Sequence, residues 1–170
     1  MPVDEVSLEI INMERAALDR WGRGDPDGFL EISAAEVTYF DPFLPEAIHG
    51  LKALRQYYAQ LRGKIFVESD EMIDPKVQLS GETAILSYRY ASRGRSGDEM
   101  RWNATEVYRR GEEGWRIAHT HWSFTQPDVA GLQALAADFP ASRDAYRWHW
   151  NPAAAHAVGI APPGLREYWQ

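Results

Sequence analysis

The residues best suited to chemistry lie in the segment Tyr39-Phe40-Asp41-Pro42, which Ile48-His49-Gly50 follows closely. Residues 37–40 are β-branched and aromatic, which predicts a strand, and Pro42 should end it while favouring an extended backbone at Asp41. A carboxylate held among aromatic groups can have its pKa raised into the working range of a general base. Asp-Pro is also a common turn pair, so the local sequence leaves both interpretations of Asp41 open.

Glu106 is the second carboxyl candidate. Side chains alternate along a strand, so Glu106 should share a face with aromatic neighbours such as Trp102 and Tyr108. A carboxylate in apolar surroundings needs a partner or shifts toward its neutral form, and two carboxyls in one apolar cavity could act as one base and one acid. The alternative is a salt bridge across the sheet to Arg89 or Arg101.

His119 and His121 share one face of a predicted strand, while Thr120 and Trp122 share the other. Two histidines with Asp41 would suit iron, but strand histidines at this spacing are more often interface or hydrogen-bonding residues. We therefore predict no metal and no cofactor, and we keep both histidines as candidates for proton transfer.

Two further polar residues have alternative roles. His49 precedes a glycine at an expected helix start, so it either completes that turn or transfers protons near Asp41. Arg89 lies between two tyrosines and would bind an anionic ligand or pair with Glu106.

The elements that must position these residues can be predicted from periodicity. Apolar residues at helical spacing predict a first helix that ends at Gly22 or Gly24. These residues are Val6, Ile10, Met13, Ala17 and Trp21. Asp25-Pro26 should open a short second helix, and Gly50 a third that closes near Gly63.

From residue 65 onward the period is two, which predicts strands over residues 65–73, 76–79, 83–92, 99–110 and 115–124. Strands joined by such short links must be antiparallel. The expected fold class is α+β, with a curved antiparallel sheet wrapped around three N-terminal helices and a central cavity suited to a small molecule.

The composition narrows the class of function. The chain of 170 residues has a formal charge of −7 and no cysteine, which disfavours nucleic-acid partners and excludes thiol chemistry. No apolar run is long enough to span a membrane and no signal peptide is visible, so we expect a cytoplasmic protein. Residues 1–127 should form one domain. The aromatic and proline-rich extension over residues 128–170 should pack on that domain or on a partner chain.

The run YFDPFLPEAIHGLKALRQYYAQL resembles ketosteroid isomerases of the nuclear transport factor 2-like superfamily. The exit Gly24-Asp25 and the run EVYRRGEEGWRIAHTHWS are similar to SnoaL-like polyketide cyclases and to calmodulin-kinase association domains. The resemblance covers about residues 5–127 and implies the cystatin-like cone fold. The superfamily includes enzymes, binding proteins and assembly modules, so the resemblance does not fix the reaction.

The resemblance implies roles for individual residues. Asp41 falls on the isomerases' general base and Glu106 on the protonated acid of their oxyanion hole, whereas Ala17 stands where their oxyanion-hole tyrosine would be. Tyr57 or Tyr58 could replace that tyrosine. The same resemblance places Thr120 and Trp122 on the pocket side and His119 and His121 on the outer face.

We therefore expect a pocket enzyme doing cofactor-independent acid–base chemistry as an isomerase, cyclase or dehydratase on a small apolar metabolite with a carbonyl. Its expected catalytic residues are Asp41, Glu106 and Tyr58. Its expected ligand-binding residues are Tyr39, Phe43, Tyr57, Arg89, Trp102, Thr120 and Trp122. Two alternatives remain open: a non-catalytic binding or assembly domain of the same fold, and hydrolysis of an epoxide. A homodimer through the outer face of the sheet is also predicted.

Overall fold

The computed structural model describes residues 3–95, 97 and 99–125, and the predicted extension over residues 128–170 lies outside them. The helices come before most of the strands, as predicted. The elements are α1 (Val3–Gly22), α2 (Asp27–Ile32), β1 (Ser33–Phe40), β2 (Ile48–His49), α3 (Leu51–Leu61), β3 (Val67–Ser80), β4 (Thr83–Gly94), β5 (Glu99–Gly111) and β6 (Gly114–Phe124).

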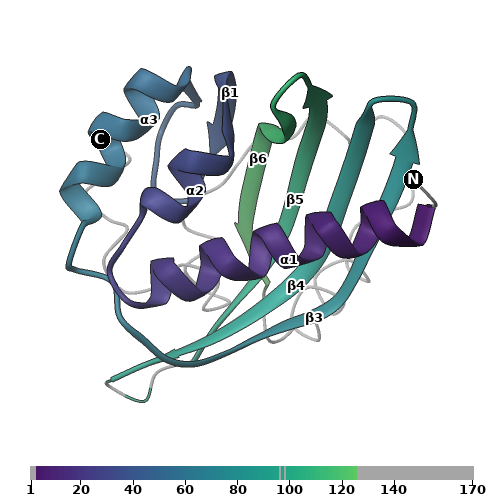
Figure 1. Cartoon of the computed structure of the whole chain (residues 1–170). Coiled ribbons are helices and arrows are strands. Elements are labelled where there is room, and N and C mark those ends of the chain that lie inside the picture. Colours follow the sequence, from purple (N-terminus) through teal and green to yellow (C-terminus); the bar gives the residue numbers. More distant parts are fainter. Residues whose placement is uncertain (1–2, 96, 98, 126–170) are drawn as a thin grey trace, which may run out of the picture. The chain divides into compact units, whose positions relative to one another are not determined.

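The strands form one six-stranded sheet in the order β2-β1-β6-β5-β4-β3. Strands β3 to β6 form the predicted antiparallel meander. β1 lies beside β6 and runs parallel to it, a pairing that the sequence pattern does not reveal because the partners are far apart in the chain. The sheet curves around α1, which crosses its concave side (Figure 1). The predicted α+β fold is confirmed.

One strand boundary was predicted wrongly. Residues 65–73 and 76–79 were expected to be separate strands, but β3 is continuous. Its pairing with β4 shifts between Ile73 and Lys76, and Asp74 adopts a positive φ of 50°. β3 is an edge strand of the sheet, where a bulge and the missing N–H of Pro75 can be accommodated without ending the ladder.

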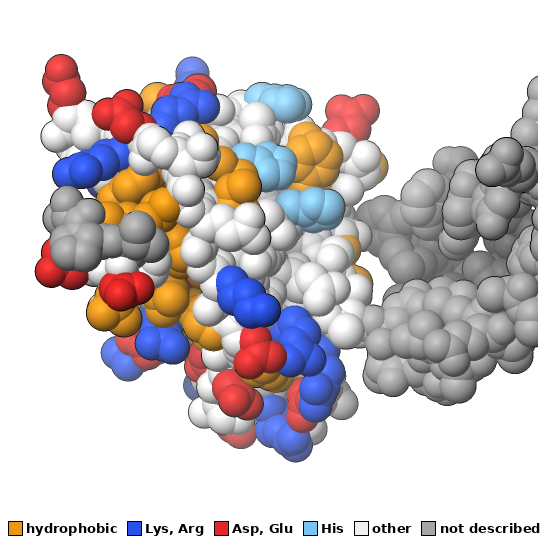
Figure 2. All heavy atoms as spheres, turned by 90° about the vertical axis from the view of Figure 1, so that its right-hand side faces the viewer, with side chains coloured by type: hydrophobic (Ala, Val, Ile, Leu, Met, Phe, Trp, Pro, Cys, Tyr) orange, Lys and Arg blue, Asp and Glu red, His pale blue; other side chains and the backbone are white. Residues whose placement is uncertain are grey.

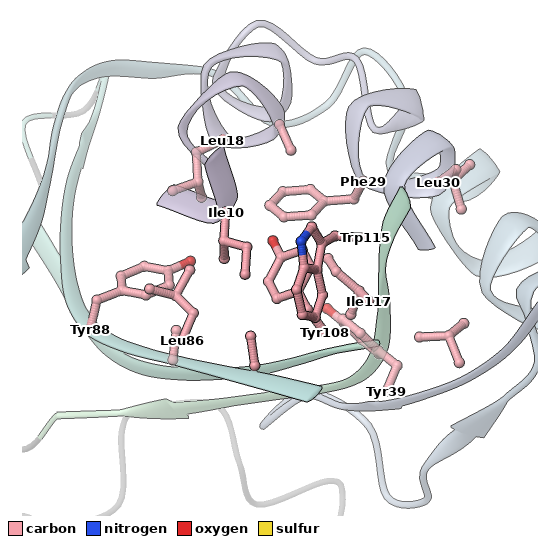
Figure 3. Packing of buried hydrophobic residues seen from close by; sticks show 14 of the residues in the cluster. Ile10, Leu18, Phe29, Leu30, Tyr39, Leu86, Tyr88, Tyr108, Trp115 and Ile117 are labelled. Carbon is pink, nitrogen blue, oxygen red and sulfur yellow. The ribbon is translucent and has the colours of Figure 1, made fainter. Parts of the chain in front are cut away.

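The core lies between the helices and the concave face of the sheet. Ile10 from α1 and Phe29 from α2 lie over Tyr108 and Trp115 of the sheet, and Leu18 of α1 belongs to the same buried cluster (Figure 3). All five side chains are at least nine-tenths buried, and complete burial of such a side chain contributes about 1.5–3 kcal/mol. None of the helices within the described residues has the length and apolar character needed to cross a membrane.

A corner between α1 and α2 sets the position of the end of α3. Asp25 accepts a hydrogen bond from the Asp27 backbone N–H at 3.0 Å and pairs with Arg20 at 2.7 Å. The Gly63 N–H donates to the Gly24 carbonyl at 2.9 Å, so the residues that follow α3 are held against this corner. These residues form part of the cavity described next.

Candidate functional site

A cavity of about 480 Å³ lies in the part of the chain that the structure describes. This volume is typical of sites for small organic molecules. Most of its lining side chains are aromatic. They come from the three helices, from strands β1, β4, β5 and β6, and from two loops. The aromatic members are Trp21, Phe29, Tyr39, Phe43, Tyr57, Tyr58, Phe66, Tyr90, Trp102 and Trp122.

Asp41 lies in the wall of this cavity, directly after β1, and is half-buried. The Tyr39 hydroxyl donates to its Oδ2 at 2.7 Å, and the Phe43 backbone N–H donates to its Oδ1 at 2.8 Å. Each carboxylate oxygen has two lone pairs, so one on each remains able to accept a proton from a bound molecule. Asp41 thus combines the turn role and the pocket position that the sequence left as alternatives.

Three tyrosines surround Asp41. The ring of Tyr39 lies 6.1 Å from that of Tyr57 and 5.6 Å from that of Tyr58. Burial, followed by the charge of Asp41, raises the pKa of Tyr57 to about 12. Burial also raises the pKa of Tyr39 and of Tyr58 well above the usual value. All three hydroxyls therefore stay protonated and can donate.

Glu106 is fully buried but is not among the residues that line the cavity. The Thr120 hydroxyl donates to its Oε2 at 2.6 Å, while its Oε1 has no hydrogen-bond partner among the described residues. Glu106 is therefore buried without lining the cavity. Of the two carboxyl candidates, only Asp41 lies in the cavity wall, so the expectation that both would line one cavity is wrong.

The alternative role for Glu106, a salt bridge to Arg89 or Arg101, is not formed either. Arg89 pairs with Asp74 at 2.6 Å and Arg101 pairs with Glu99 at 2.7 Å. Alternation places both arginines on the exposed face of the sheet, opposite to Glu106. For the same reason, Arg89 does not reach the cavity as a ligand-binding residue.

Glu14 is a buried residue that the sequence interpretation missed. It is fully buried, and its carboxylate accepts hydrogen bonds from the hydroxyls of Tyr88 at 2.6 Å and Tyr108 at 2.5 Å. Burial raises the pKa of Glu14 to about 6. Burial and the nearby charge of Glu14 raise the pKa of Glu106 well above its usual value, which favours its neutral form. A signal was present, because Glu14 lies on the apolar stripe of its helix, four residues after Ile10.

A bulge in β6 decides which of its residues face inward. Pairing with β5 shifts between Tyr108–Ile117 and Val107–His119, so Ala118 is an additional residue. Ile117 is therefore buried, although strict alternation would place it on the same face as the histidines. Beyond the bulge, Thr120 faces the core.

His119 and His121 lie outside the cavity. The ring of Phe40 packs against both, at 5.5 and 5.6 Å, and Thr38 Oγ1 lies 2.6 Å from His119 Nδ1. Burial and the neighbouring His121 hold the pKa of His119 below its usual value. The three described histidines, which include His49, gather beside a hydrophobic side chain on this face (Figure 2).

His49 is exposed in β2, where it pairs with Thr38, and it does not line the cavity. Within the described part of the chain, no group of three or more potential metal ligands is found. The arrangement therefore brings neither His49 nor a metal site to Asp41.

The structure brings together seven of the predicted site residues in the cavity wall. These are Tyr39, Asp41, Phe43, Tyr57, Tyr58, Trp102 and Trp122. Thr120 lies behind the wall with Glu106. Tyr90, Ser92 and Lys64 were not predicted but also line the cavity, and for the two β4 residues strand alternation was the available signal.

Comparisons with known proteins agree with this fold. Residues 15–120 match the model of the SnoaL-like domain. A "putative ketosteroid isomerase" from Parabacteroides distasonis ATCC 8503 is 39% identical over 69% of this chain and 86% of that chain, with a TM-score of 0.63. No protein among those with curated descriptions matches.

Two more distant structures share the fold. A "putative dehydratase from the NTF2-like family" of Streptomyces avermitilis is 21% identical over 74% of this chain and 99% of that chain, with a TM-score of 0.60. The CaMKII hub of S. rosetta is 21% identical over 68% of this chain and 94% of that chain, with a TM-score of 0.57. The chain belongs to the SnoaL-like domain family and has the NTF2-like fold.

Proposed function

We propose that this protein is an enzyme that moves a proton on an apolar, carbonyl-containing small molecule without a cofactor, as an isomerase, cyclase or dehydratase. The observation that carries the proposal is the Asp41 carboxylate in an aromatic cavity, oriented by Tyr39 and by the Phe43 N–H. A fixed carboxylate facing a site of this volume is the arrangement that a general base requires.

The proposed step breaks a C–H bond beside the carbonyl. The proton moves to Asp41 and the electron pair moves onto the carbonyl oxygen, which becomes an enolate that a protonated tyrosine such as Tyr57 or Tyr58 stabilises by donating a hydrogen bond. Asp41 then returns the proton to a different carbon in an isomerase. In a dehydratase, the electron pair returns from the enolate to break a C–O bond, and the leaving hydroxide takes the proton from Asp41 as water. In a cyclase, the enolate carbon bonds to a second carbonyl carbon, and the alkoxide formed there takes the proton from Asp41. Aromatic walls exclude water, which strengthens each of these electrostatic interactions.

The names of two relatives support this class of reaction, since one is called a putative ketosteroid isomerase and one a putative dehydratase. The chain has Ala17 where the resemblance to the isomerases implies a donor tyrosine, and Ala17 is buried. The donor must therefore come from another residue, and the tyrosines beside Asp41 are the nearest candidates.

Exchange of the α-protons of a ketone for deuterium tests this proposal without knowledge of the natural substrate. We expect the wild type to accelerate exchange of 2-tetralone in D₂O, followed by proton nuclear magnetic resonance, and Asp41→Asn to reduce that rate by about 100-fold or more. The asparagine amide retains an acceptor for the Phe43 N–H, so folding should be unaffected.

Tyr39→Phe is the matched control, because it keeps the carboxylate and removes only one of its two hydrogen bonds. Its loss of exchange rate should be much smaller than that of Asp41→Asn. Equal exchange by wild type and Asp41→Asn would contradict the role assigned to Asp41.

A binding or assembly role is the second candidate. It is favoured by Phe40, which is 45% exposed on the outer face of the sheet between His119 and His121. Among structures with the same fold are CaMKII hub and association domains, whose names describe assembly modules. We infer a homodimer through this outer face, which is compatible with catalysis inside the cavity.

A further inference from the structure

The cavity wall contains one cation that the reaction proposed above does not use. Among the described residues that line the cavity, only Asp41 and Lys64 are charged. Lys64 is exposed to solvent, so it lies where the cavity opens. The two charges are opposite in sign, which means that the wall can recognise two different kinds of polar group in one bound molecule.

The charge of Lys64 is available to a ligand. No described residue forms a hydrogen bond or an ion pair with its ammonium group. Arg62, two residues earlier, takes the acidic groups of this corner instead, since it pairs with Asp25 at 3.4 Å and with Asp27 at 2.5 Å. Lys64 is therefore a cation that no carboxylate in the described part of the chain neutralises.

The backbone fixes the position of Lys64. The Gly63 N–H donates to the Gly24 carbonyl at 2.9 Å, and the Lys64 N–H donates to the Leu61 carbonyl at 3.0 Å. Gly63 has a φ of +71°, a conformation that glycine adopts readily and that turns the chain out of α3. A charge on a segment held in this way loses less freedom on binding than a charge on a mobile loop.

A second cation lies at the same end of the cavity. The Arg95 guanidinium lies 4.6 Å from the centre of the Phe66 ring, and Phe66 lines the cavity two residues after Lys64. Glu68 and Asp70, which follow on β3, are not among the residues that line the cavity. This end of the wall therefore favours an anionic group.

The positive end is separate from Asp41. β1, which ends directly before Asp41, and β3, which begins three residues after Lys64, are separated in the sheet by three other strands. Along α3, Tyr57 and Leu61 are four residues apart, or about 6 Å, and Lys64 lies beyond Leu61. Tyr57 is the end of this span that senses the charge of Asp41. A ligand that reaches both charged residues must therefore extend over several bonds.

We propose that Lys64 binds a carboxylate group of the molecule from which Asp41 removes a proton. The substrate class is therefore an oxo acid, with an apolar body, a carbonyl near Asp41 and a carboxylate several bonds away near Lys64. One lysine matches the single charge of a carboxylate, whereas a phosphate dianion would require more donors. This inference rests on the proposed function, because Asp41 supplies the second contact.

The test compares two ketones of nearly the same shape, 6-oxo-6-phenylhexanoate and its neutral primary amide. Dissociation constants are measured by isothermal titration calorimetry at pH 7 and low ionic strength. We expect the wild type to bind the carboxylate about fivefold more tightly than the amide, as for one accessible ion pair. This preference should shrink as salt is added, because salt screens exposed charges.

Substitutions of lysine assign the preference to one residue. Lys64→Met should abolish it and leave the binding of the amide unchanged, whereas Lys64→Arg should keep it. Lys52→Met is the matched control, because Lys52 is exposed on α3 and does not line the cavity. It removes the same charge from the protein and should keep the preference.

Three results would each overturn the inference. The first is a wild type that binds the carboxylate no more tightly than the amide, which includes a wild type that binds neither. The second is a preference that survives Lys64→Met. The third is an equal loss of preference in Lys52→Met, which would indicate a general effect of net charge.

Asp41→Asn separates this inference from the proposed function. It should stop deuterium exchange of the protons beside the ketone in both compounds, followed by proton nuclear magnetic resonance, while keeping the preference for the carboxylate. If exchange is unaffected by Asp41→Asn but the preference depends on Lys64, the proposed reaction fails and the binding inference holds. If exchange depends on Asp41 but the wild type shows no preference, the reaction holds and the binding inference fails.

Discussion

Glu14 and Glu106 place two carboxyl groups in a core shielded from solvent, and only one of them is well supplied with donors. Glu14 accepts from two tyrosines, whereas Glu106 accepts from one threonine. Two like charges in such a site are mutually unfavourable, so ionisation of one carboxyl disfavours ionisation of the other. The arrangement makes stability depend on protonation.

The expected pH dependence follows from the raised pKa values. Glu14 has a pKa of about 6 in the folded protein against 4.5 in an unfolded chain, so the folded state binds the proton more tightly. Its contribution is therefore complete below pH 4.5 and is lost as the pH rises through about 6. For Glu14 alone, the free energy of unfolding should be about 1 kcal/mol higher at pH 5 than at pH 7.

Urea unfolding at several pH values measures this effect, and Glu14→Gln supplies the comparison. The glutamine variant should lose about 1 kcal/mol of the difference between pH 5 and pH 7. Glu31→Gln is a suitable control, because Glu31 is an exposed carboxylate paired with Arg20. Identical pH dependence in the wild type and Glu14→Gln would show that Glu14 has an ordinary pKa.

Individual residues differed in how well the sequence predicted them. Asp41 could be placed because proline chemistry and strand periodicity are local signals. The contacts of Glu14 could not, since its donors Tyr88 and Tyr108 come from strands more than 70 residues away, with separations of 74 and 94. The partners of Arg89 were misassigned because alternation was not applied to both ends of the expected pair.

At the scale of elements, the turn between α1 and α2 is the most constrained connection. Gly24 has a φ of +82°, and an added Cβ would lie 3.1 Å from Gly63 Cα and 3.3 Å from the Phe66 ring. A positive φ costs about 1–2 kcal/mol for a residue with a side chain, before any steric conflict with the backbone. The corner therefore requires glycine for two separate reasons.

Gly24→Ala should lower the free energy of unfolding by about 2–3 kcal/mol, measured by urea unfolding, because strain and contact add. Gly81→Ala is the matched control: it has a φ of +59° with nothing within 4 Å of the added Cβ. Its loss should be only about 1–2 kcal/mol. Equal losses would mean that the contact with Gly63 is easily relieved.

The elements show which features local patterns can predict. Helix spacing and the alternation of strands gave the right order of elements, and short links gave the antiparallel meander. The bulges at Asp74 and Ala118 were not predicted, because a bulge depends on how two strands pair. The first of these joined two predicted strands into one, and the second turned Ile117 inward.

At the scale of the whole molecule, the homodimer that we infer forms through the outer face of the sheet. A stable homodimer usually buries about 1,600 Å² in total, and a long-stranded sheet face with an exposed aromatic residue is suited to this. Phe40→Ser should therefore shift the protein from dimer to monomer, as measured by light scattering coupled to size-exclusion chromatography. Wild-type protein that is already monomeric would contradict the inferred dimer.

Phe43→Ser is the control for general loss of apolar surface. Phe43 is 57% exposed, comparable with Phe40, but it lies in the cavity wall and contacts Trp102. This variant should remain dimeric. Dissociation by both variants to the same extent would indicate that the outer face has no special role.

The parallel pairing of β1 with β6 has a consequence for the order in which the molecule folds. Thr38 and His119 are neighbours in space but 81 residues apart in the chain, so this contact closes a very long loop. Strands β3 to β6 can pair locally and early, whereas β1 can dock only after the last strand is in place. Asp41, which directly follows β1, should therefore reach its place late in folding, after the sheet that surrounds it has already formed.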